Sequence, residues 1–380
     1  MNRQSAHGIR TVSIVGARPQ FVKLSPVSRA MKRARLEIDD CIVHTGQHYD
    51  DAMSKIFFDE LDIPAPTLNL GVGSGPQGRQ TARMLEAIEA YLTETSPDLV
   101  IVYGDTNSTL AGALAAAKIH IPVAHVEAGL RSFNRRMPEE LNRIATDHLA
   151  DMLFAPTRTA LQNLAAEGLQ SRALLTGDVM YDAVLYYARA AGTRPGIVGD
   201  LKLAAGEYGI ATIHRAENTT PDELETLLRR INEAAARFGR IIFPVHPRTL
   251  SVLQSDLLEW RPHANLVLTG PLSYLDMLAL IQGANWVLTD SGGLQKEAFF
   301  LDCPCVTLRN ETEWLETLQD NANCVAGSDG ARLADKLTEI VRRPRRSYDA
   351  APPRRDGPFG NGHAAEQIVE GICRLHEARQ

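Results

Sequence analysis

The sequence has few cysteines and no long apolar segment. Its five cysteines include no Cys-x-x-Cys pair, so we interpret them as buried apolar side chains rather than disulfides or zinc ligands. No uncharged apolar run approaches the roughly 20 residues that a membrane span needs. The amino-terminal segment also lacks the pattern of a signal peptide. We therefore expect a cytoplasmic protein that does not cross a membrane.

An excess of positive charge is also missing. The formal net charge is −6 at pH 7, which favours neither a nucleic-acid partner nor a membrane partner. The sequence contains no His-Glu-x-x-His motif, no P-loop and no dinucleotide fingerprint within a strand–helix–strand unit. We therefore predict no metal and no other cofactor.

What is present is a regular alternation of short β-branched runs with stretches rich in helix-forming residues, and this alternation occurs twice. Such a pattern predicts an α/β protein with two doubly wound, Rossmann-like domains. We place the domains at residues 1–190 and 191–355, followed by a C-terminal segment at 356–380. The predicted strands lie at 10–16, 39–46, 97–105, 121–127 and 150–157, and at 209–215, 240–247, 264–270, 284–290 and 303–309.

Polar residues follow several predicted strands of the first half, where ligands bind in parallel sheets. Arg18 and the backbone amides of its turn form a candidate anion site, with Lys23 about one turn further on. Asp105 and Glu127 each follow an apolar run. Asp105 is either a functional acid or a helix cap. Glu127 needs a partner at such a position, and Arg131 is the candidate four residues later.

The segment "RMPEELNR" has the features of a helix start. Pro138 occupies the first position, and Glu139 and Glu140 lie in the first turn, where the helix dipole favours acids. The pair is therefore explained by helix structure alone, and at most one of the two glutamates needs a chemical role.

In the second half, His214 and His246 follow two predicted strands, each close to an arginine, which favours an anion site over two structural histidines. The segment "TDSGGLQKEA" places Ser291, Gly292 and Gly293 between a strand and a helix. A hydroxyl and two glycines at a helix start can bind a phosphate. Glu297, just inside that helix, is positioned to bind a ribose diol. The alternative for this segment is an ordinary strand–turn–helix corner.

These segments together resemble the non-hydrolysing UDP-N-acetylglucosamine 2-epimerases. The similarity extends from about residue 11 to 372, and its motifs occur in the family's order. They are "GARPQFVK", "TGQHYD", "GDTNSTLAG", "HVEAGLRSF", "MPEELNR", "HRAEN", "PVHPRT", "TDSGGLQKEA" and "PFGNGHAAEQI".

The resemblance implies a fold similar to that of the GT-B glycosyltransferases, with a C-terminal helix that crosses back to the first domain. It also implies a homodimer that interconverts UDP-GlcNAc and UDP-ManNAc for bacterial surface polysaccharide. By motif, it places Arg18 and Lys23 near the substrate and assigns a role in activity to His214. It makes Asp105, Glu127 and Glu139 catalytic acids, and Ser291 and Glu297 contacts to the UDP phosphate and ribose.

The sequence also departs from the common family pattern. It has "GARPQ" where "GTRPE" is common, and "ETEWLE" where "ETERPE" is common. A subgroup that acts on a UDP-linked 2,3-diacetamido-glucuronate shares these features, which makes that sugar the alternative substrate. The segment 47–50 differs from the form that binds a second, activating UDP-GlcNAc in part of the family. The competing functions are a GT-B glycosyltransferase, a hydrolysing epimerase and a non-catalytic sugar-nucleotide sensor.

Overall fold

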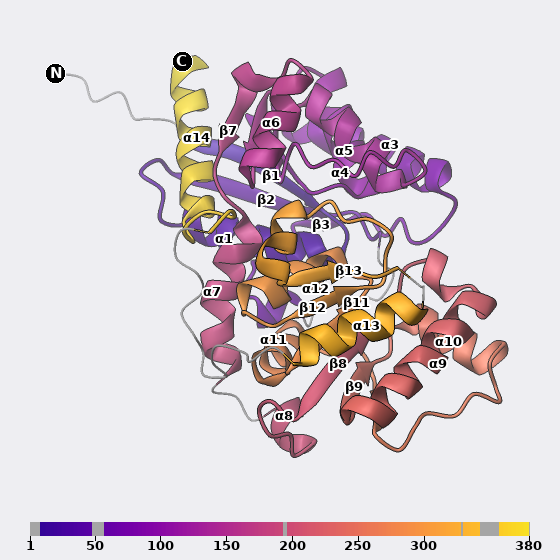
Figure 1. Cartoon of the computed structure of the whole chain (residues 1–380). Helices are drawn as coiled ribbons and strands as arrows, with labels where there is room; N and C mark the ends of the chain where they lie inside the picture. The colour runs from indigo at the N-terminus through magenta and orange to yellow at the C-terminus, as the bar shows by residue number, and fades with distance from the viewer. Residues whose placement is uncertain (1–7, 48–56, 193–195, 328–329, 343–356, 380) are drawn as a thin grey trace. The chain divides into compact units, whose positions relative to one another are not determined.

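We describe the protein from a computed structural model, which covers residues 8–47, 57–192, 196–327, 330–342 and 357–379. The chain divides into two compact units (Figure 1). Unit 1 comprises residues 1–183 with 355–380, and unit 2 comprises residues 184–354. The division falls between residues 183 and 184, inside helix α7 (Val179–Ala191). The expected domain boundary at residue 190 lies in the same helix and stays a prediction.

A seven-stranded parallel sheet forms the centre of unit 1, in the order β3-β2-β1-β4-β5-β6-β7. Its strands are β1 (Ile9–Val15), β2 (Ile38–His44), β3 (Leu68–Asn69), β4 (Leu99–Tyr103), β5 (Val123–Val126), β6 (Met152–Ala155) and β7 (Ala173–Leu175). Every residue of β4 and β5 is buried, as expected for a parallel sheet with helices on both faces. The strand order reverses between β1 and β4, which is where ligands bind in such sheets.

The helices of unit 1 begin where local sequence signals place them. They include α1 (Arg18–Met31), α3 (Gln77–Thr95), α4 (Asn107–Lys118), α5 (Pro138–Leu149) and α6 (Arg158–Ala166). Helix α5 has Pro138 in its first position and both glutamates in its first turn, as predicted. Helix α1 begins at Arg18, so that Pro19 is its second residue.

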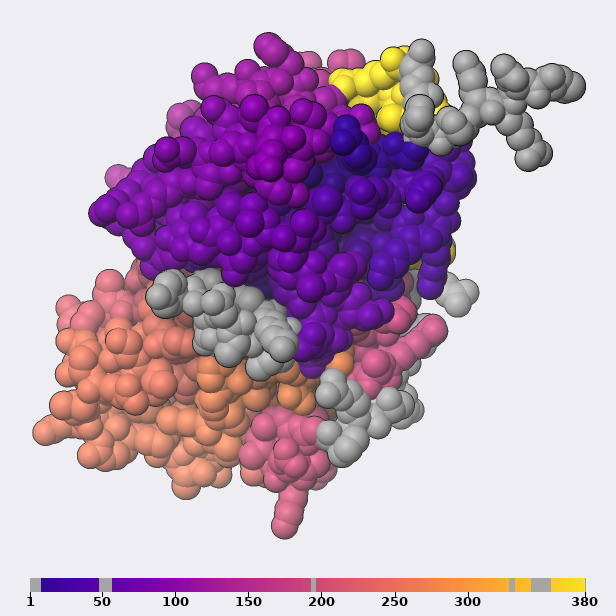
Figure 2. Space-filling model, turned by 180° about the vertical axis from the view of Figure 1, so that it is seen from behind, coloured from indigo at the N-terminus to yellow at the C-terminus, as the bar shows by residue number. Residues whose placement is uncertain are grey.

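The C-terminal helix α14 (Ala364–Arg379) belongs to unit 1 and contacts α1. Figure 2 shows its yellow residues beside the indigo residues of the N-terminal part. Arg35 donates from Nη2 to Glu377 over 2.9 Å. Asp182 of α7 accepts a 2.8 Å hydrogen bond from the backbone N–H of Ala365, a group that has no partner within the helix. The expected return of the C-terminal helix to the first domain is confirmed.

Unit 2 contains a six-stranded parallel sheet in the order β10-β9-β8-β11-β12-β13. Its strands are β8 (Tyr208–Thr212), β9 (Arg240–Pro244), β10 (Leu266–Thr269), β11 (Trp286–Thr289), β12 (Cys305–Thr307) and β13 (Asn323–Val325). Its helices are α8 (Ile197–Asp200), α9 (Pro221–Phe238), α10 (Pro247–Ser255), α11 (Tyr274–Gly283), α12 (Gly292–Phe300) and α13 (Gly330–Val341). Ile210 and Ala211 of β8 belong to two different core clusters because successive side chains of a strand point to opposite faces. The strand order reverses between β8 and β11.

All ten predicted strands are present, and three short ones, β3, β7 and β13, were not predicted. Each of these three has only two or three residues, and none lies in a longer run like the one at 303–309 that revealed the equally short β12. Four of the five cysteines are buried and Cys41 is half-buried. Among the described residues no helix is long and apolar enough to span a membrane, and no cluster of side chains is suited to hold a metal ion.

Candidate active site

In both units, the predicted site residues follow the strands at which the strand order reverses. Arg18 comes after β1 and Asp105 after β4, while Glu127 follows the adjacent strand β5. In unit 2, His214 comes after β8 and Ser291 after β11. The parallel sheets therefore bring each set to one edge, as the sequence predicted.

Glu127 lies in a strained turn and forms a buried ion pair with Lys23. Its φ of 73° is in the left-handed region, where a residue with a Cβ is strained. The Lys23 ammonium donates to Oε1, and the two side chains are 7% and 3% exposed. A Cβ on Gly104 would lie 2.7 Å from Lys23 Nζ, and the φ of Gly104 is 64°, a backbone conformation that favours glycine.

Arg131 does not partner Glu127, and that prediction was wrong. The i+4 rule holds inside helices, whereas residues 127–131 form an irregular turn. The Arg131 guanidinium instead binds Asp147, with 2.7 Å from Nη1 to Oδ2. It also binds both oxygens of Glu167 over 2.7 and 2.6 Å. A contact between Arg131 and substrate stays a prediction.

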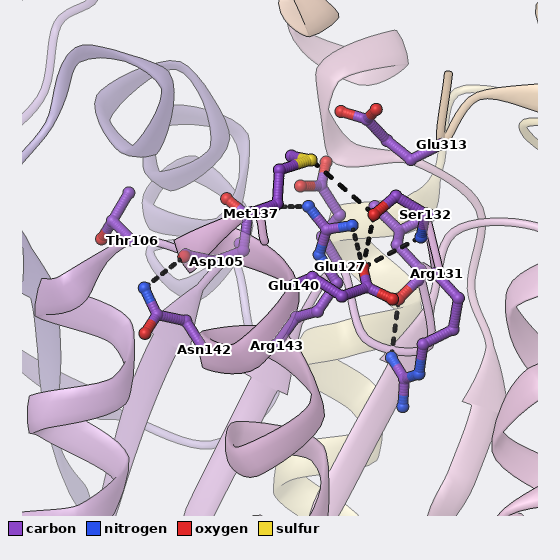
Figure 3. A network of polar contacts seen from close by, with 12 residues as sticks. Asp105, Thr106, Glu127, Arg131, Ser132, Met137, Glu140, Asn142, Arg143 and Glu313 are labelled. Carbon is purple, nitrogen blue, oxygen red and sulfur yellow. Dashed lines mark hydrogen bonds and ion pairs between the residues drawn. The ribbon is translucent and has the colours of Figure 1, made fainter. Parts of the chain in front are cut away.

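Asp105 is held by Arg143, a residue that we did not predict. Figure 3 shows Arg143 of α5 between Asp105 and Glu140. Its Nη2 lies 2.5 Å from Asp105 Oδ2, and its Nη1 lies 2.8 Å from Glu140 Oε2. Arg143 is 1% exposed and Glu140 is fully buried, whereas the Asp105 side chain is 25% exposed. Asp105 is therefore an oriented acid that a ligand can still reach.

The two glutamates of the α5 start have different environments. The carboxylate of Glu140 accepts hydrogen bonds from the backbone N–H groups of Ser132 and Phe133 and from the Ser132 hydroxyl (Figure 3). These bonds fix the loop before α5, so Glu140 has a structural role. Glu139 is half-exposed, and within the described part of the chain its carboxylate has no hydrogen-bond partner. Glu139 is thus the glutamate that is available for chemistry.

The turn after β1 differs from the predicted anion site. The backbone amides of Gly16 and Ala17 donate to Gln20 Oε1 over 2.8 and 3.0 Å, so they are not free for a ligand. The Gln20 amide donates onward to the Tyr103 carbonyl and the Thr109 hydroxyl. A carboxylate could not make these two donations, which gives the glutamine in "GARPQ" a physical reason. Arg18 itself is half-buried, with its guanidinium 4.6 Å from the Phe57 ring.

In unit 2, Asp290 is a buried anchor for His214. Asp290 Oδ2 accepts from the backbone N–H groups of His214 and Arg215 over 3.0 and 2.9 Å, and from the Asn218 amide over 3.1 Å. Its Oδ1 lies 3.1 Å from His214 Nδ1. Burial by itself would raise the pKa of Asp290, but the hydrogen bonds and charge of His214 outweigh it and hold the pKa at about 2.

This pairing determines what His214 can do. Because Nδ1 faces a carboxylate, it carries the hydrogen, and Nε2 is the nitrogen left to act on a ligand. The side chain is 35% exposed, so a ligand can reach it. The His246 ring lies 5.4 Å away, which confirms that the two strands bring these histidines together. His246 also caps α10, where its side chain accepts from the Arg248 N–H over 3.2 Å.

The predicted phosphate site has the expected strand–turn–helix form. Ser291 caps α12, and its hydroxyl accepts from the Leu294 N–H over 3.3 Å. A Cβ on Gly292 would lie 3.0 Å from Glu313 Oε1, which is a tight contact. Gly292 and Gly293 are the first two residues of α12, and Glu297 is a buried residue of the same helix.

Trp314 of the unusual "ETEWLE" segment contacts this helix. It is buried, and the Lys296 ammonium lies 3.7 Å from the centre of its ring. This contact makes Trp314 a packing partner of α12. Part of the segment 47–50 lies outside the described residues, so an activating second site is not tested.

Sequence reasoning missed Arg143, His125, Asp147 and Asp290 as parts of the site. Only Asp290 had a signal, because it is the last residue of the predicted strand 284–290 and follows its apolar run. The other three are interior positions of a helix or a strand, and the sequence does not indicate which residue each one contacts.

Comparison with known proteins agrees with this geometry. A family model described as UDP-N-acetylglucosamine 2-epimerase matches residues 29–373. A Methanococcus maripaludis protein named UDP-N-acetylglucosamine 2-epimerase homolog is 48% identical over 97% of this chain and 100% of its own length. A Pseudomonas aeruginosa UDP-2,3-diacetamido-2,3-dideoxy-D-glucuronate 2-epimerase is 43% identical over 97% of this chain and 100% of its own length.

Among solved structures, the Methanocaldococcus jannaschii UDP-GlcNAc 2-epimerase in complex with UDP-GlcNAc and UDP has a TM-score of 0.89 and 40% sequence identity. The match covers 96% of this chain and 100% of that one. A match of this extent includes parts of both units. The chain therefore belongs to the UDP-N-acetylglucosamine 2-epimerase family.

Proposed function

We propose that this protein inverts C2 of a UDP-linked 2-acetamido sugar, with UDP-GlcNAc and UDP-ManNAc as the interconverted pair. The observation that carries the proposal is the placement of two acids, Asp105 and Glu127, directly after the neighbouring strands β4 and β5. Each is oriented by a buried cation. Membership in the family supports the assignment.

The chemistry explains why acids and cations occur together. The hydrogen on C2 is not adjacent to a carbonyl, so a base alone cannot remove it. As the bond from C1 to UDP weakens, the ring gains oxocarbenium character and this hydrogen becomes acidic. Loss of the C2 proton and of UDP gives a 2-acetamidoglucal. Addition of UDP to C1 and of a proton to the other face of C2 then gives the epimer.

In this proposal, unit 1 supplies the proton donors and acceptors. Asp105, Glu127 and Glu139 exchange protons with the sugar and with the departing UDP. Lys23 and Arg143 hold two of these acids in place. The strained backbone at Glu127 is consistent with such a role, because strain is retained where the side-chain position matters.

Unit 2 binds UDP in the same proposal. The start of α12, with Ser291, Gly292 and Gly293, binds phosphate, because helix N-termini stabilise anions. Glu297 binds the ribose, and His214 acts on the diphosphate through Nε2. His246 and Arg18 are further candidates for contacts with the substrate. A homodimer stays a prediction of the family resemblance, and a cytoplasmic location stays a prediction from the sequence composition.

A specific observation keeps one other substrate in consideration. The relative from Pseudomonas aeruginosa acts, by its name, on a diacetamido-glucuronate. That sugar adds a carboxylate at C6, and Arg135 and Arg136 are exposed cations in the loop before α5. The kcat/KM values for the two UDP-sugars in direct competition separate these candidates. A preference for the diacetamido acid of more than about tenfold, or ~1.4 kcal/mol, would replace UDP-GlcNAc as substrate and leave the mechanism unchanged.

The test of the reaction is an NMR spectrum of the protein with UDP-GlcNAc in D₂O. An epimerase with this mechanism yields UDP-ManNAc that carries deuterium at C2. Free ManNAc with UDP would identify a hydrolysing epimerase, and UDP release that depends on an acceptor sugar would identify a glycosyltransferase. Binding without any turnover would identify a sensor. An epimer without deuterium would contradict elimination with solvent exchange.

A further inference from the structure

His125 is a fully buried residue of β5, two positions before Glu127. Its Nδ1 lies 2.7 Å from Asp147 Oδ1, and its Nε2 lies 2.7 Å from the carbonyl oxygen of Gly104. A carboxylate and a carbonyl can only accept hydrogen bonds, so both ring nitrogens must carry hydrogens. His125 is therefore a buried imidazolium.

Asp147 of α5 balances this charge. Its second oxygen accepts from the Gly129 N–H over 3.1 Å and from Arg131 Nη1 over 2.7 Å. Burial would raise the pKa of Asp147, but the hydrogen bonds and charges of His125 and Arg131 hold it below its ordinary value. Glu167 is the second anion around Arg131, so the cluster contains two cations and two anions. The exposed His148 lies at its edge, 3.3 Å from Glu167.

The cluster of His125, Asp147, Arg131 and Glu167 connects the three segments that carry the proposed acids. Gly104, which accepts from His125, directly precedes Asp105. Gly129, which donates to Asp147, follows Glu127 by two residues. Asp147 itself is on α5, the helix that begins next to Glu139.

We propose that His125 and Asp147 are a buried positioning pair that fixes the acid-bearing turns after β4 and β5 relative to helix α5. Neither residue is a catalytic residue in this inference, because both act through the segments that they hold. The inference rests on the proposed epimerase function.

Loss of the pair lowers turnover without affecting UDP binding. A displacement of about 1 Å in a catalytic group can cost roughly 100-fold in rate, and we expect a fall of that order in kcat for Asp147→Ala. The phosphate and ribose contacts proposed for Ser291, His214 and Glu297 are in unit 2 and share no partner with Asp147. The dissociation constant for UDP should therefore stay within about twofold of the wild-type value, the change expected for sites without shared partners.

The conservative variant Asp147→Asn separates positioning from simple loss of structure. Its Oδ1 can still accept from Gly129 and Arg131, while its amide donates to His125 Nδ1. His125 then becomes neutral and still donates from Nε2 to Gly104. We therefore expect Asp147→Asn to restore kcat to within about tenfold of wild type. His148→Gln, at the exposed neighbouring position, is the matched control and should leave kcat unchanged.

Two measurements complete the test. Titration with UDP counts the folded sites, so that kcat is expressed per UDP bound, and a variant that only unfolds loses sites rather than turnover per site. Nitrogen-15 NMR of histidine-labelled protein, with His125→Gln as the assignment control, reports the protonation of His125. The expected signature is a doubly protonated ring in the wild type and an Nε2–H tautomer in Asp147→Asn.

The outcomes distinguish a failure of the proposed function from a failure of the positioning pair. A wild-type protein that binds UDP-sugars without epimerising them overturns the proposed function, and the positioning pair with it. An active wild type in which Asp147→Ala keeps its kcat per UDP bound overturns the positioning pair alone. A neutral His125 in the wild type also overturns the pair, whatever the kinetics of the variants.

Discussion

Asp290→Asn is the substitution that most directly tests the anchor of His214. In the wild type, the Asp290 carboxylate accepts four hydrogen bonds while fully buried, and His214 Nδ1 is one of the donors. An asparagine can keep the acceptor that faces Arg215 and Asn218. Its amide then faces His214 Nδ1, which must become an acceptor. The variant therefore moves the ring hydrogen to Nε2, the nitrogen that we propose contacts the ligand.

The expected cost in stability follows from the pKa of Asp290. The pKa falls from 3.8 to about 2 on folding, and this corresponds to about 2 kcal/mol of unfolding free energy at pH 7. Because the folded pKa is depressed, this stabilisation is complete above pH 4 and is lost as the pH falls toward 2. The difference between wild type and variant should therefore be largest at neutral pH and should shrink between pH 4 and pH 2.

Urea unfolding of wild type and variant at several pH values measures this difference. UDP titration and kcat report the effect on His214, and both UDP affinity and turnover should fall. Asp335→Asn, at an exposed position of α13, is the matched control and should change neither stability nor activity. If Asp290→Asn is as stable as wild type at pH 7 and keeps full turnover, the anchor role is refuted.

Three further predictions concern other positions. Removing the charge of each proposed acid should lower kcat by roughly 100-fold with the fold retained by circular dichroism, in the variants Asp105→Asn, Glu127→Gln and Glu139→Gln. Near-wild-type rates in all three would show that the site is wrong. Ser291→Ala should weaken UDP binding by about tenfold in calorimetry, since it removes a hydroxyl at a helix start, and an unchanged affinity would argue against the phosphate site. Burial raises the pKa of Asp40 to about 7 despite hydrogen bonds from Thr11 and Ser13, so stability should fall as the pH rises from 4 to 7, and Asp40→Asn should reduce this slope in urea unfolding. An unchanged slope of stability against pH in Asp40→Asn would contradict the role of Asp40 in this pH dependence.

The sequence alone was sufficient for the architecture and for the strand ends at which the candidate site residues lie. Helix starts such as Pro138 with its following glutamates depend on interactions within one turn, so a short segment determines them. Strands that lie within a longer apolar, β-branched run have enough apolar positions to be recognised. The ends of parallel strands then gather at one edge of each sheet, which is why the sequence could propose Asp105, Glu127, His214 and Ser291 as candidate site residues.

The tertiary structure decided which residue partners which. Glu127 binds Lys23, 104 positions away in the chain, rather than Arg131 at the local spacing. Whether Glu139 or Glu140 stays available depended on the loop amides around residue 132, and the orientation of His214 depended on a carboxylate from another strand. Such contacts are set by where the strands and helices are placed relative to one another. Local propensities determine which elements form, but burial and charge pairing between distant segments determine what each ionisable side chain can do.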